Sequence, residues 1–198
     1  MTDAGYTRAQ IERVLLKSTL PACCRIIPRR HLATPLGTAP ADSRFCAKAD
    51  GFTLLYAAPE FATAFAEVVV RDRFTHKQTR RVRLVEITER AWVTIAMKRR
   101  AQLSLLDLRG DGCLRLGAPT DSVRARHHAE GQALGRAIYF GHRDIDGLIF
   151  PSRLTGADVY AVFDRGIAKL KAQRTGGLSK HPELAQVLSR HSIGLIAD

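Results

Sequence analysis

The stretch GFTLLYAAPEFATAFAEVVVRDRF, residues 51–74, constrains the fold more than any other part of the chain. Its first part, FTLLYAA, is a continuous apolar run typical of a buried strand, and Pro59 suits the first turn of a helix that follows. Four large apolar side chains would share one side of that helix: Phe61, Phe65, Val68 and Val69. Glu67 would fall on the other side. The stretch predicts a buried strand and a helix in direct succession, with one carboxylate turned away from the main apolar stripe.

The rest of the chain alternates between strand-like and helix-like segments without a regular order. Further strands are predicted at residues 23–27, 81–87, 92–97, 103–108, 147–153 and 158–164. Helices are predicted at residues 7–18, 122–140, 167–173 and 182–191. Residues 28–50 contain three prolines and little periodicity, which predicts a long irregular loop. This order favours an α+β fold, with a single compact mixed domain over residues 1–198.

The composition is that of a globular protein, with 45% hydrophobic and 25% charged residues. No segment approaches the roughly 18 consecutive apolar residues that span a bilayer, and the N-terminus lacks the basic start and apolar stretch of a secretory signal. We therefore expect a cytoplasmic location. The cysteines show no C-x-x-C spacing, so we expect reduced structural thiols rather than zinc ligands or disulfides at Cys23, Cys24, Cys46 and Cys113.

The strongest compositional signal is the formal net charge of +12, with an isoelectric point near 10.2. Such a surface attracts a partner or substrate that carries negative charge. Nucleic acid, a dinucleotide and an acidic protein all qualify, although many basic surfaces are simply solvated. The sequence contains neither a G-x-x-x-x-G-K-[ST] phosphate loop nor a G-x-G-x-x-G turn after a strand. A nucleotide bound by this chain would be held by other means.

Spacing alone favours an unremarkable role for Glu67, an exposed ion pair with Arg71 at i, i+4 that is worth about 0.3 kcal/mol. The alternative is that this side of the helix lines a cleft. There the carboxylate could hold a ribose hydroxyl and stabilise a developing positive charge. Tyr56 ends the preceding strand, so a ligand beneath the strand-to-helix junction could meet its ring and the carboxylate together. A tyrosine on a strand is nevertheless more often a core residue.

Other side chains have suitable chemistry and a commoner structural explanation. Arg25 and Arg44 could grip a pyrophosphate through bidentate hydrogen bonds, although most arginines of so basic a chain lie on the surface. Ser152 follows a strand and a proline, where its hydroxyl could bond a ligand or, more commonly, cap a turn. No G-x-S-x-G elbow surrounds this serine. The adjacent His127 and His128 cannot share one helical face, which makes them weak candidates for metal or base roles.

Taken in order, an arginine in CCRII, an arginine in DSRF, the stretch LLYAAPEFATAFAEV and the segment DGLIFPSRLTG resemble the RES-domain family, named for its Arg, Glu and Ser. The resemblance covers about residues 20–165, and its most specific part is YAAPEFATAFAEV. The site residues that it implies are Arg25, Arg44, Tyr56, Glu67 and Ser152. Many members have GGRW where this chain has DSRF, so Phe45 replaces a tryptophan and could still supply an aromatic wall.

RES proteins are typically toxins of bacterial toxin–antitoxin pairs, with a fold similar to ADP-ribosyltransferases, and they act on NAD+. The resemblance implies an enzyme that degrades NAD+ by phosphorolysis or hydrolysis, or one that transfers ADP-ribose to a protein. It implies NAD+ as the substrate and no cofactor, with inorganic phosphate as a candidate co-substrate. The partner that it implies is a cognate Xre-type antitoxin, whose usual role in this family is to block the active-site cleft.

The chemistry of nicotinamide release agrees with these residue types. Cleavage of the nicotinamide–ribose bond expels a neutral leaving group, so the barrier lies in the oxocarbenium-like ribose that forms. A carboxylate interacts more strongly with that cation than with a neutral sugar. We therefore expect Glu67 to bind the ribose and stabilise its charge. The other expected roles are nicotinamide packing for Tyr56, phosphate binding for Arg25 and Arg44, and a hydrogen bond to nicotinamide or ribose for Ser152.

Two rival functions stay open on the sequence. Protein ADP-ribosylation would leave labelled ADP-ribose attached to a protein. A basic nucleic-acid-binding protein would account for the charge and for the segments KQTRRVRL and KRRAQLSL. Against it, the aromatic residues are few and scattered, and no helix-turn-helix or zinc-finger pattern is evident. We therefore expect no direct binding of nucleic acid and no membrane association.

Overall fold

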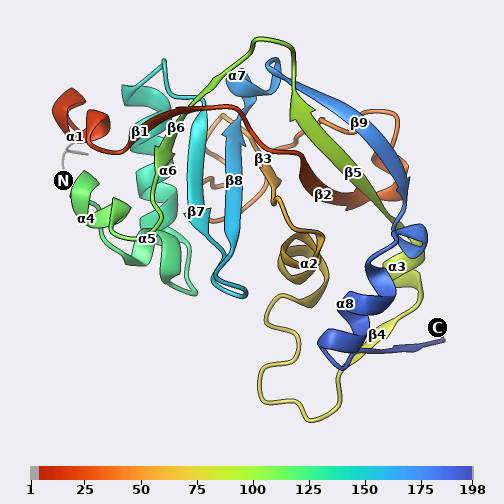
Figure 1. The fold of residues 1–198 in the computed structure, drawn as a ribbon. Coiled ribbons are helices and arrows are strands. Elements are labelled where there is room, and N and C mark those ends of the chain that lie inside the picture. The colour runs from red at the N-terminus through yellow and green to blue at the C-terminus, as the bar shows by residue number, and fades with distance from the viewer. Residues whose placement is uncertain (1–4, 198) are drawn as a thin grey trace.

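The computed structural model describes residues 5–197, in which two main β-sheets pack together and helices cover the outer face of the larger sheet (Figure 1). The larger sheet has the order β1 (Leu15–Ser18), β6 (Leu103–Asp107), β7 (Gly147–Pro151), β8 (Asp158–Phe163) and β3 (Leu54–Ala57). Its neighbours are antiparallel except for the parallel pair β6 and β7. The antiparallel smaller sheet contains β2 (Cys23–Pro28), β5 (Arg90–Met97) and β9 (Leu170–Gly177). A parallel pair is formed by β4 (Arg81–Arg83) and β10 (Gly194–Ile196).

The helices fall into two groups, one beside the larger sheet at the left and one below the smaller sheet and its junction with the larger one (Figure 1). One group comprises α1 (Arg8–Glu12), α4 (Gly112–Leu116), α5 (Asp121–Arg124) and α6 (Ala129–Gly141). The other comprises α2 (Phe61–Phe65), the π-helical turn η2 (Ala66–Val70), α3 (Val85–Thr88) and α8 (Leu184–Arg190). The remaining short elements are α7 (Asp164–Ile167) and the 3₁₀ turns η1 (Arg29–His31) and η3 (Leu178–Lys180).

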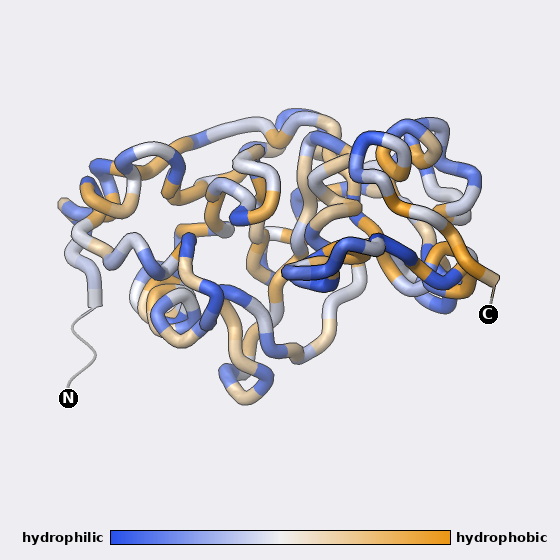
Figure 2. The backbone as a smooth tube through the Cα atoms, turned by 90° about the horizontal axis from the view of Figure 1, so that it is seen from below, coloured by the Kyte–Doolittle hydropathy of each residue, from blue (hydrophilic) through white to orange (hydrophobic). Residues whose placement is uncertain are grey.

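Both faces of the larger sheet are buried, which explains the continuous apolar runs of its central strands. Leu105 and Ile149 belong to the core between the two sheets, whereas their neighbours Leu106 and Leu148 belong to the core beneath the helices. Successive side chains of a strand point to opposite faces of the sheet, and here each face packs against an apolar core. Figure 2 shows hydrophobic residues interspersed with hydrophilic ones along the chain. None of the helices within residues 5–197 is long and apolar enough to cross a membrane.

The mixed arrangement confirms the predicted α+β class, although several predicted elements differ. The helix predicted at 7–18 begins at its Thr7 cap but ends at Glu12, because residues 15–18 pair with β6. The segment 167–173, predicted as a helix, contributes instead to β9, which lies along β5. The helix predicted at 122–140 is interrupted between α5 and α6, and the strand predicted at 81–87 gives way to α3. For residues 15–18 and 170–173, pairing with a neighbouring strand decides the local structure.

Helix α6 packs directly on the backbone of the DSRF segment, residues 42–45, through two glycines one turn apart. A Cβ added at Gly131 would lie 2.3 Å from the carbonyl oxygen of Arg44. A Cβ added at Gly135 would lie 1.9 Å from the carbonyl oxygen of Phe45. These positions therefore cannot carry a side chain unless the segment shifts. Glycine lowers the stability of a helix by about 1 kcal/mol relative to alanine, but here it lets α6 pack against the backbone that carries Arg44.

The substitution Gly135→Ala is expected to lower the free energy of unfolding by about 1–3 kcal/mol, because the new methyl group would overlap a backbone carbonyl. Gly141→Ala is the matched control in the same helix, since nothing lies within 4 Å of a Cβ added there. That variant should be neutral or slightly stabilising. Denaturant unfolding followed by circular dichroism measures both changes. Equal stability of the two variants would contradict the close packing of α6 on the segment.

Candidate active site

A cleft forms where the smaller sheet meets the edge of the larger one. Cys24 of β2 and Ala58, just after β3, exchange backbone hydrogen bonds of 2.7 and 3.0 Å. Helix α2 and the turn η2 follow this junction directly along the chain and lie below it in Figure 1. As a result, Arg25 of β2, Tyr56 of β3 and Glu67 of η2 line one cavity of about 180 Å³.

Glu67 lies where three neighbouring cavities meet. Besides the cavity of about 180 Å³, it lines one of about 230 Å³ and one of about 630 Å³. Tyr56 lines the two smaller cavities, and Arg44 lines the two larger ones. Arg25 also borders a further cavity of about 450 Å³ beside the loop that follows β2. The cavities share lining residues and together describe one cleft, with a carboxylate at its centre and an arginine on either side.

The local backbone around Glu67 is unusual. After α2 the helix widens into the π-helical turn η2, whose last hydrogen bond runs 2.7 Å from the Arg71 N–H to the Ala66 carbonyl. Arg71 then adopts φ 48° and ψ −137°, a conformation in the region that favours glycine. Such π-helical turns and strained residues are frequent at functional sites. The exposed ion pair predicted between Glu67 and Arg71 is not among the ion pairs found within residues 5–197.

The partner of Glu67 is Ser152. The Ser152 hydroxyl, with the residue only 3% exposed, donates a hydrogen bond of 2.6 Å to Glu67 Oε1. The same hydroxyl oxygen accepts bonds of 3.1 Å from the backbone N–H groups of Leu154 and Thr155. Because two donors already point at this oxygen, its own proton is directed to the carboxylate. Ser152 therefore caps its turn and orients Glu67, and it is not among the residues lining the three cavities.

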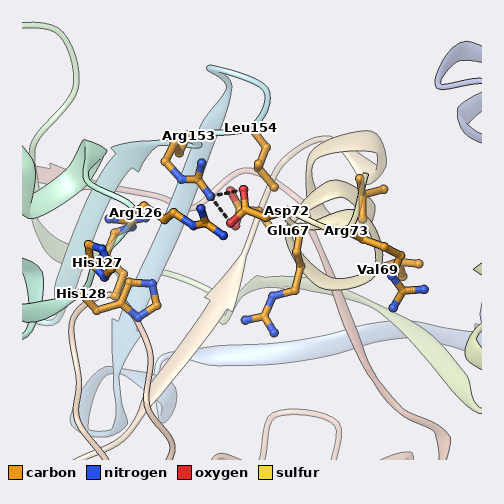
Figure 3. A pocket seen from close by; sticks show the side chains of 12 residues that line it. Glu67, Val69, Asp72, Arg73, Arg126, His127, His128, Arg153 and Leu154 are labelled. Atoms are coloured by element: carbon orange, nitrogen blue, oxygen red, sulfur yellow. Dashed lines mark hydrogen bonds and ion pairs between the residues drawn. The ribbon is translucent and has the colours of Figure 1, made fainter. Parts of the chain in front are cut away.

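Two further contacts tie the turn after β7 to the helix that carries Glu67. The Arg153 guanidinium lies 2.7 Å from both carboxylate oxygens of Asp72, just beyond η2 (Figure 3). The hydroxyls of Thr63 and Thr155 lie 3.1 Å apart, and Thr63 is fully buried in α2. The turn is thus attached at both ends of the helical segment, with the contact from Ser152 to Glu67 between them. Spacing in the sequence gave no signal for these pairs, because their members lie far apart in the chain.

Tyr56 is held by its hydroxyl. That oxygen lies 3.0 Å from Ser43 Oγ and accepts a hydrogen bond of 3.3 Å from the backbone N–H of Phe45. Burial raises the pKa of Tyr56 to about 12, so the side chain is a neutral phenol at pH 7. The phenol links β3 to the segment that carries Arg44, and two predicted site residues are thereby fixed relative to each other.

Arg44 is held through its backbone and its side chain. Gln132 of α6 donates a hydrogen bond of 3.1 Å to the Ser43 carbonyl, and Arg44 Nη1 donates one of 2.8 Å to the Ala125 carbonyl. Burial lowers the pKa of Arg44, whereas the carboxylate of Glu67 raises it. The guanidinium stays protonated at pH 7, and its other N–H groups are free to meet a ligand in the cleft.

The aromatic ring beside Arg44 does not form a wall of the cleft. Phe45 is 0% exposed, and its ring packs edge-on against Phe150 with centroids 4.9 Å apart. The expectation of an aromatic wall at Phe45 is therefore wrong. The ring belongs to the core beneath the helices, where it anchors the DSRF segment.

Arg25 stands on the opposite side of Glu67. Its guanidinium donates hydrogen bonds of 3.0 and 2.9 Å to the carbonyls of Pro35 and Gly37 in the long loop. Burial lowers the pKa of Arg25 to about 10, so the group remains a cation at pH 7. None of the ion pairs within residues 5–197 joins it to a carboxylate. The charge of Arg25 is therefore available to an anionic ligand.

The cavity of about 630 Å³ is lined mainly by basic side chains, of which only Arg44 was expected as a site residue and His127 and His128 were weak candidates. Figure 3 shows Arg126, His127 and His128 on one wall and Glu67 with Asp72 on the other. Further cations line this cavity: Arg44, Arg71, Arg73 and Arg153. The runs RDRF and RARHH were visible in the sequence, but charge runs are usually solvated faces. No group of three or more residues suited to hold a metal ion occurs within residues 5–197.

All four cysteines are buried free thiols, as predicted. Burial raises the pKa of Cys23 and of Cys24 to about 12. Cys24 also lines the cavity beside Arg25, yet a protonated buried thiol is a poor nucleophile. Cys24 is therefore a poor candidate for covalent chemistry in the cleft.

Comparisons with known proteins agree with this architecture. A family model described as the RES domain matches residues 22–185. The chain is 40% identical over 95 residues to "Probable toxin y4kH" of Sinorhizobium fredii (strain NBRC 101917 / NGR234), an alignment covering 48% of this chain and 75% of that protein. The fold is similar to a chain in the crystal structure of the M. tuberculosis MbcT-MbcA toxin-antitoxin complex, with a TM-score of 0.63 and 18% identity. That match covers 93% of this chain and 98% of the other.

Fold and cleft together define a single mixed α+β protein, as predicted, with the same fold as that chain of the toxin-antitoxin complex. Within that class, the chain belongs to the RES-domain family. The Arg, Glu and Ser expected from the family resemblance are all in or next to the cleft, as Arg25, Arg44, Glu67 and Ser152. Tyr56 lines the same cleft.

The substitution Ser152→Ala is expected to lower the free energy of unfolding by about 1–3 kcal/mol, because two part-buried backbone N–H donors and one carboxylate oxygen lose their partner. Ser189→Ala, on the exposed side of α8, is the matched control and should change stability by less than about 0.5 kcal/mol. Chemical denaturation of both variants gives the comparison. A Ser152→Ala protein as stable as the control would mean that the hydroxyl does not bridge the turn and Glu67.

Proposed function

We propose that this chain is a toxin-type enzyme that cleaves the nicotinamide–ribose bond of NAD+, by phosphorolysis or by hydrolysis, and so depletes cellular NAD+. Membership of the RES-domain family and the similarity to a probable toxin and to a toxin of a toxin–antitoxin complex support the toxin role. The carboxylate and the two arginines of the cleft support the proposed cleavage of NAD+. Protein ADP-ribosylation is the alternative within the same class of enzyme.

The observation that carries the proposal is the placement of the Glu67 carboxylate at the junction of the cavities, with one oxygen held by Ser152. Loss of neutral nicotinamide leaves a ribose with the positive charge of an oxocarbenium ion. An oriented carboxylate stabilises this cation more than it stabilises the substrate, which lowers the barrier. Glu67 would also accept a hydrogen bond from a ribose hydroxyl.

The other residues would bind the remaining parts of the substrate. Arg25 and Arg44 flank Glu67 and would hold the phosphate groups of NAD+, since guanidinium groups match phosphate oxygens. Tyr56 would pack against nicotinamide, because its ring lines the cavities that Glu67 also lines. Ser152 would act through Glu67 rather than through a direct contact. No resident cofactor is needed for this chemistry, and inorganic phosphate would be a co-substrate in the phosphorolytic reaction.

We also propose an antitoxin of the Xre type as the partner, acting in the cytoplasm where NAD+ is available. The net charge of +12 and the arginines around the cleft favour a partner with an acidic surface. Such a partner, placed over the cleft, would block access of NAD+ to Glu67. The same charge would attract the dinucleotide itself.

The substitution Glu67→Gln is expected to lower kcat for NAD+ consumption by at least about 100-fold, because the amide has similar shape but cannot stabilise the cation by charge. Glu130→Gln is the control, since that residue is exposed in the first turn of α6 and lines none of the three cavities. Purified proteins are incubated with NAD+ with and without inorganic phosphate, and nicotinamide and the ADP-ribose product are quantified.

Phosphate-dependent loss of NAD+ would identify a phosphorylase, and phosphate-independent loss would identify a hydrolase. Labelled ADP-ribose retained on a protein would favour the transferase alternative. Full turnover by a folded Glu67→Gln protein would contradict the central role of the carboxylate. No loss of NAD+ together with salt-sensitive binding of duplex DNA would instead favour a nucleic-acid-binding protein.

A further inference from the structure

His128 lies in the cleft on the wall opposite Glu67 and has no part in the function described so far. It directly precedes α6, is partly buried, and lines the cavities of about 230 and 630 Å³, both of which Glu67 also lines. Figure 3 shows its imidazole within the cleft. Among residues 5–197, no hydrogen bond or ion pair engages the ring. The imidazole is therefore free to meet a small molecule that enters the cleft.

The surroundings of His128 keep its imidazole uncharged at pH 7. Burial lowers the pKa of His128 below its ordinary value of 6.5. Four neighbouring side chains lower that pKa further: Arg44, Arg71, Arg153 and His127. Two other ionisable groups line the cavity of about 230 Å³ with it, Glu67 and the neutral phenol of Tyr56. A neutral imidazole has one unprotonated nitrogen, which can accept a proton.

We propose that His128 is the general base that accepts the proton of the nucleophile attacking the ribose. The inference rests on the proposed cleavage of NAD+. The bond between ribose C1′ and the nicotinamide nitrogen breaks, and its electron pair leaves with nicotinamide, which becomes neutral. A bond forms between C1′ and an oxygen of water or phosphate. The proton of that oxygen moves to the free imidazole nitrogen, which gives an imidazolium ion.

The other groups of the cleft are poorly suited to this task. Arginine side chains do not give up their protons at neutral pH and have no acceptor site. The Tyr56 phenol is protonated, since its pKa is raised to about 12. Glu67 would lose its negative charge on accepting the proton, at the moment when that charge stabilises the cationic ribose. A separate base on the opposite wall leaves Glu67 ionised throughout the reaction.

The test compares the pH dependence of kcat for wild-type protein and His128→Gln. In the wild type, kcat should fall as the pH drops through the pKa of His128, because the imidazolium cannot accept a proton. His128→Gln should have a kcat about 100-fold lower and should lack this fall. His76→Gln is the matched control, because that histidine is exposed and lines none of the three cavities. This control should keep both the rate and the pH profile of the wild type.

Chemical rescue separates a proton acceptor from a structural residue. His128→Ala opens space in the cleft. Added imidazole should raise the kcat of this variant at least about 10-fold and leave the wild-type kcat unchanged. A wild-type pH profile in His128→Gln, or a rise in KM without a fall in kcat, would overturn the inference. Failure of imidazole to restore a folded His128→Ala protein would also overturn it. A wild-type protein that leaves NAD+ intact would instead refute the proposed function itself.

Discussion

The hydrogen bond from Ser152 to Glu67 is the contact on which the organisation of the cleft depends. It joins the turn after β7, a strand at the centre of the larger sheet, to the helical segment formed by α2 and η2. The Ser152 oxygen can make this contact because two backbone N–H groups of its own turn fix its orientation. The ion pair from Arg153 to Asp72 and the contact from Thr155 to Thr63 keep the turn beside the helix. A carboxylate held in this way needs little rearrangement when positive charge develops nearby.

Charge is arranged around this carboxylate in a way that suits an anionic substrate with a cationic reacting end. Arg25 and Arg44 lie on either side of Glu67, and both are kept partly out of water. Positive charges in such an environment attract phosphate groups more strongly than they would on an open surface. Glu67 places a negative charge between these two cations, where it would stabilise the cationic ribose of the proposed reaction. His128 lines the same cavity as Glu67. In the proposed mechanism it would accept the proton, so that charge stabilisation and proton transfer would fall to separate groups.

The sequence allowed the buried strands to be predicted because they are apolar on both faces, and it predicted that a helix follows the strand that carries Tyr56. The sequence pattern gave a wrong prediction at β9. The residues LKAQ have a helix-like pattern, but in the structure they pair with β5 as a strand. Residue periodicity also could not predict the π-helical turn η2, or that Gly131 and Gly135 lie against the DSRF backbone. The site residues came from a family resemblance in ordered motifs, whereas Asp72 and His128 enter the cleft through contacts between distant segments.

The measurement that tests this account most directly is the time course of nicotinamide release from NAD+ by the purified wild-type protein. The account predicts one nicotinamide for each NAD+ consumed, with ADP-ribose or its phosphorylated form as the other product. Intact NAD+ after prolonged incubation of folded protein, with phosphate and without it, would contradict the account.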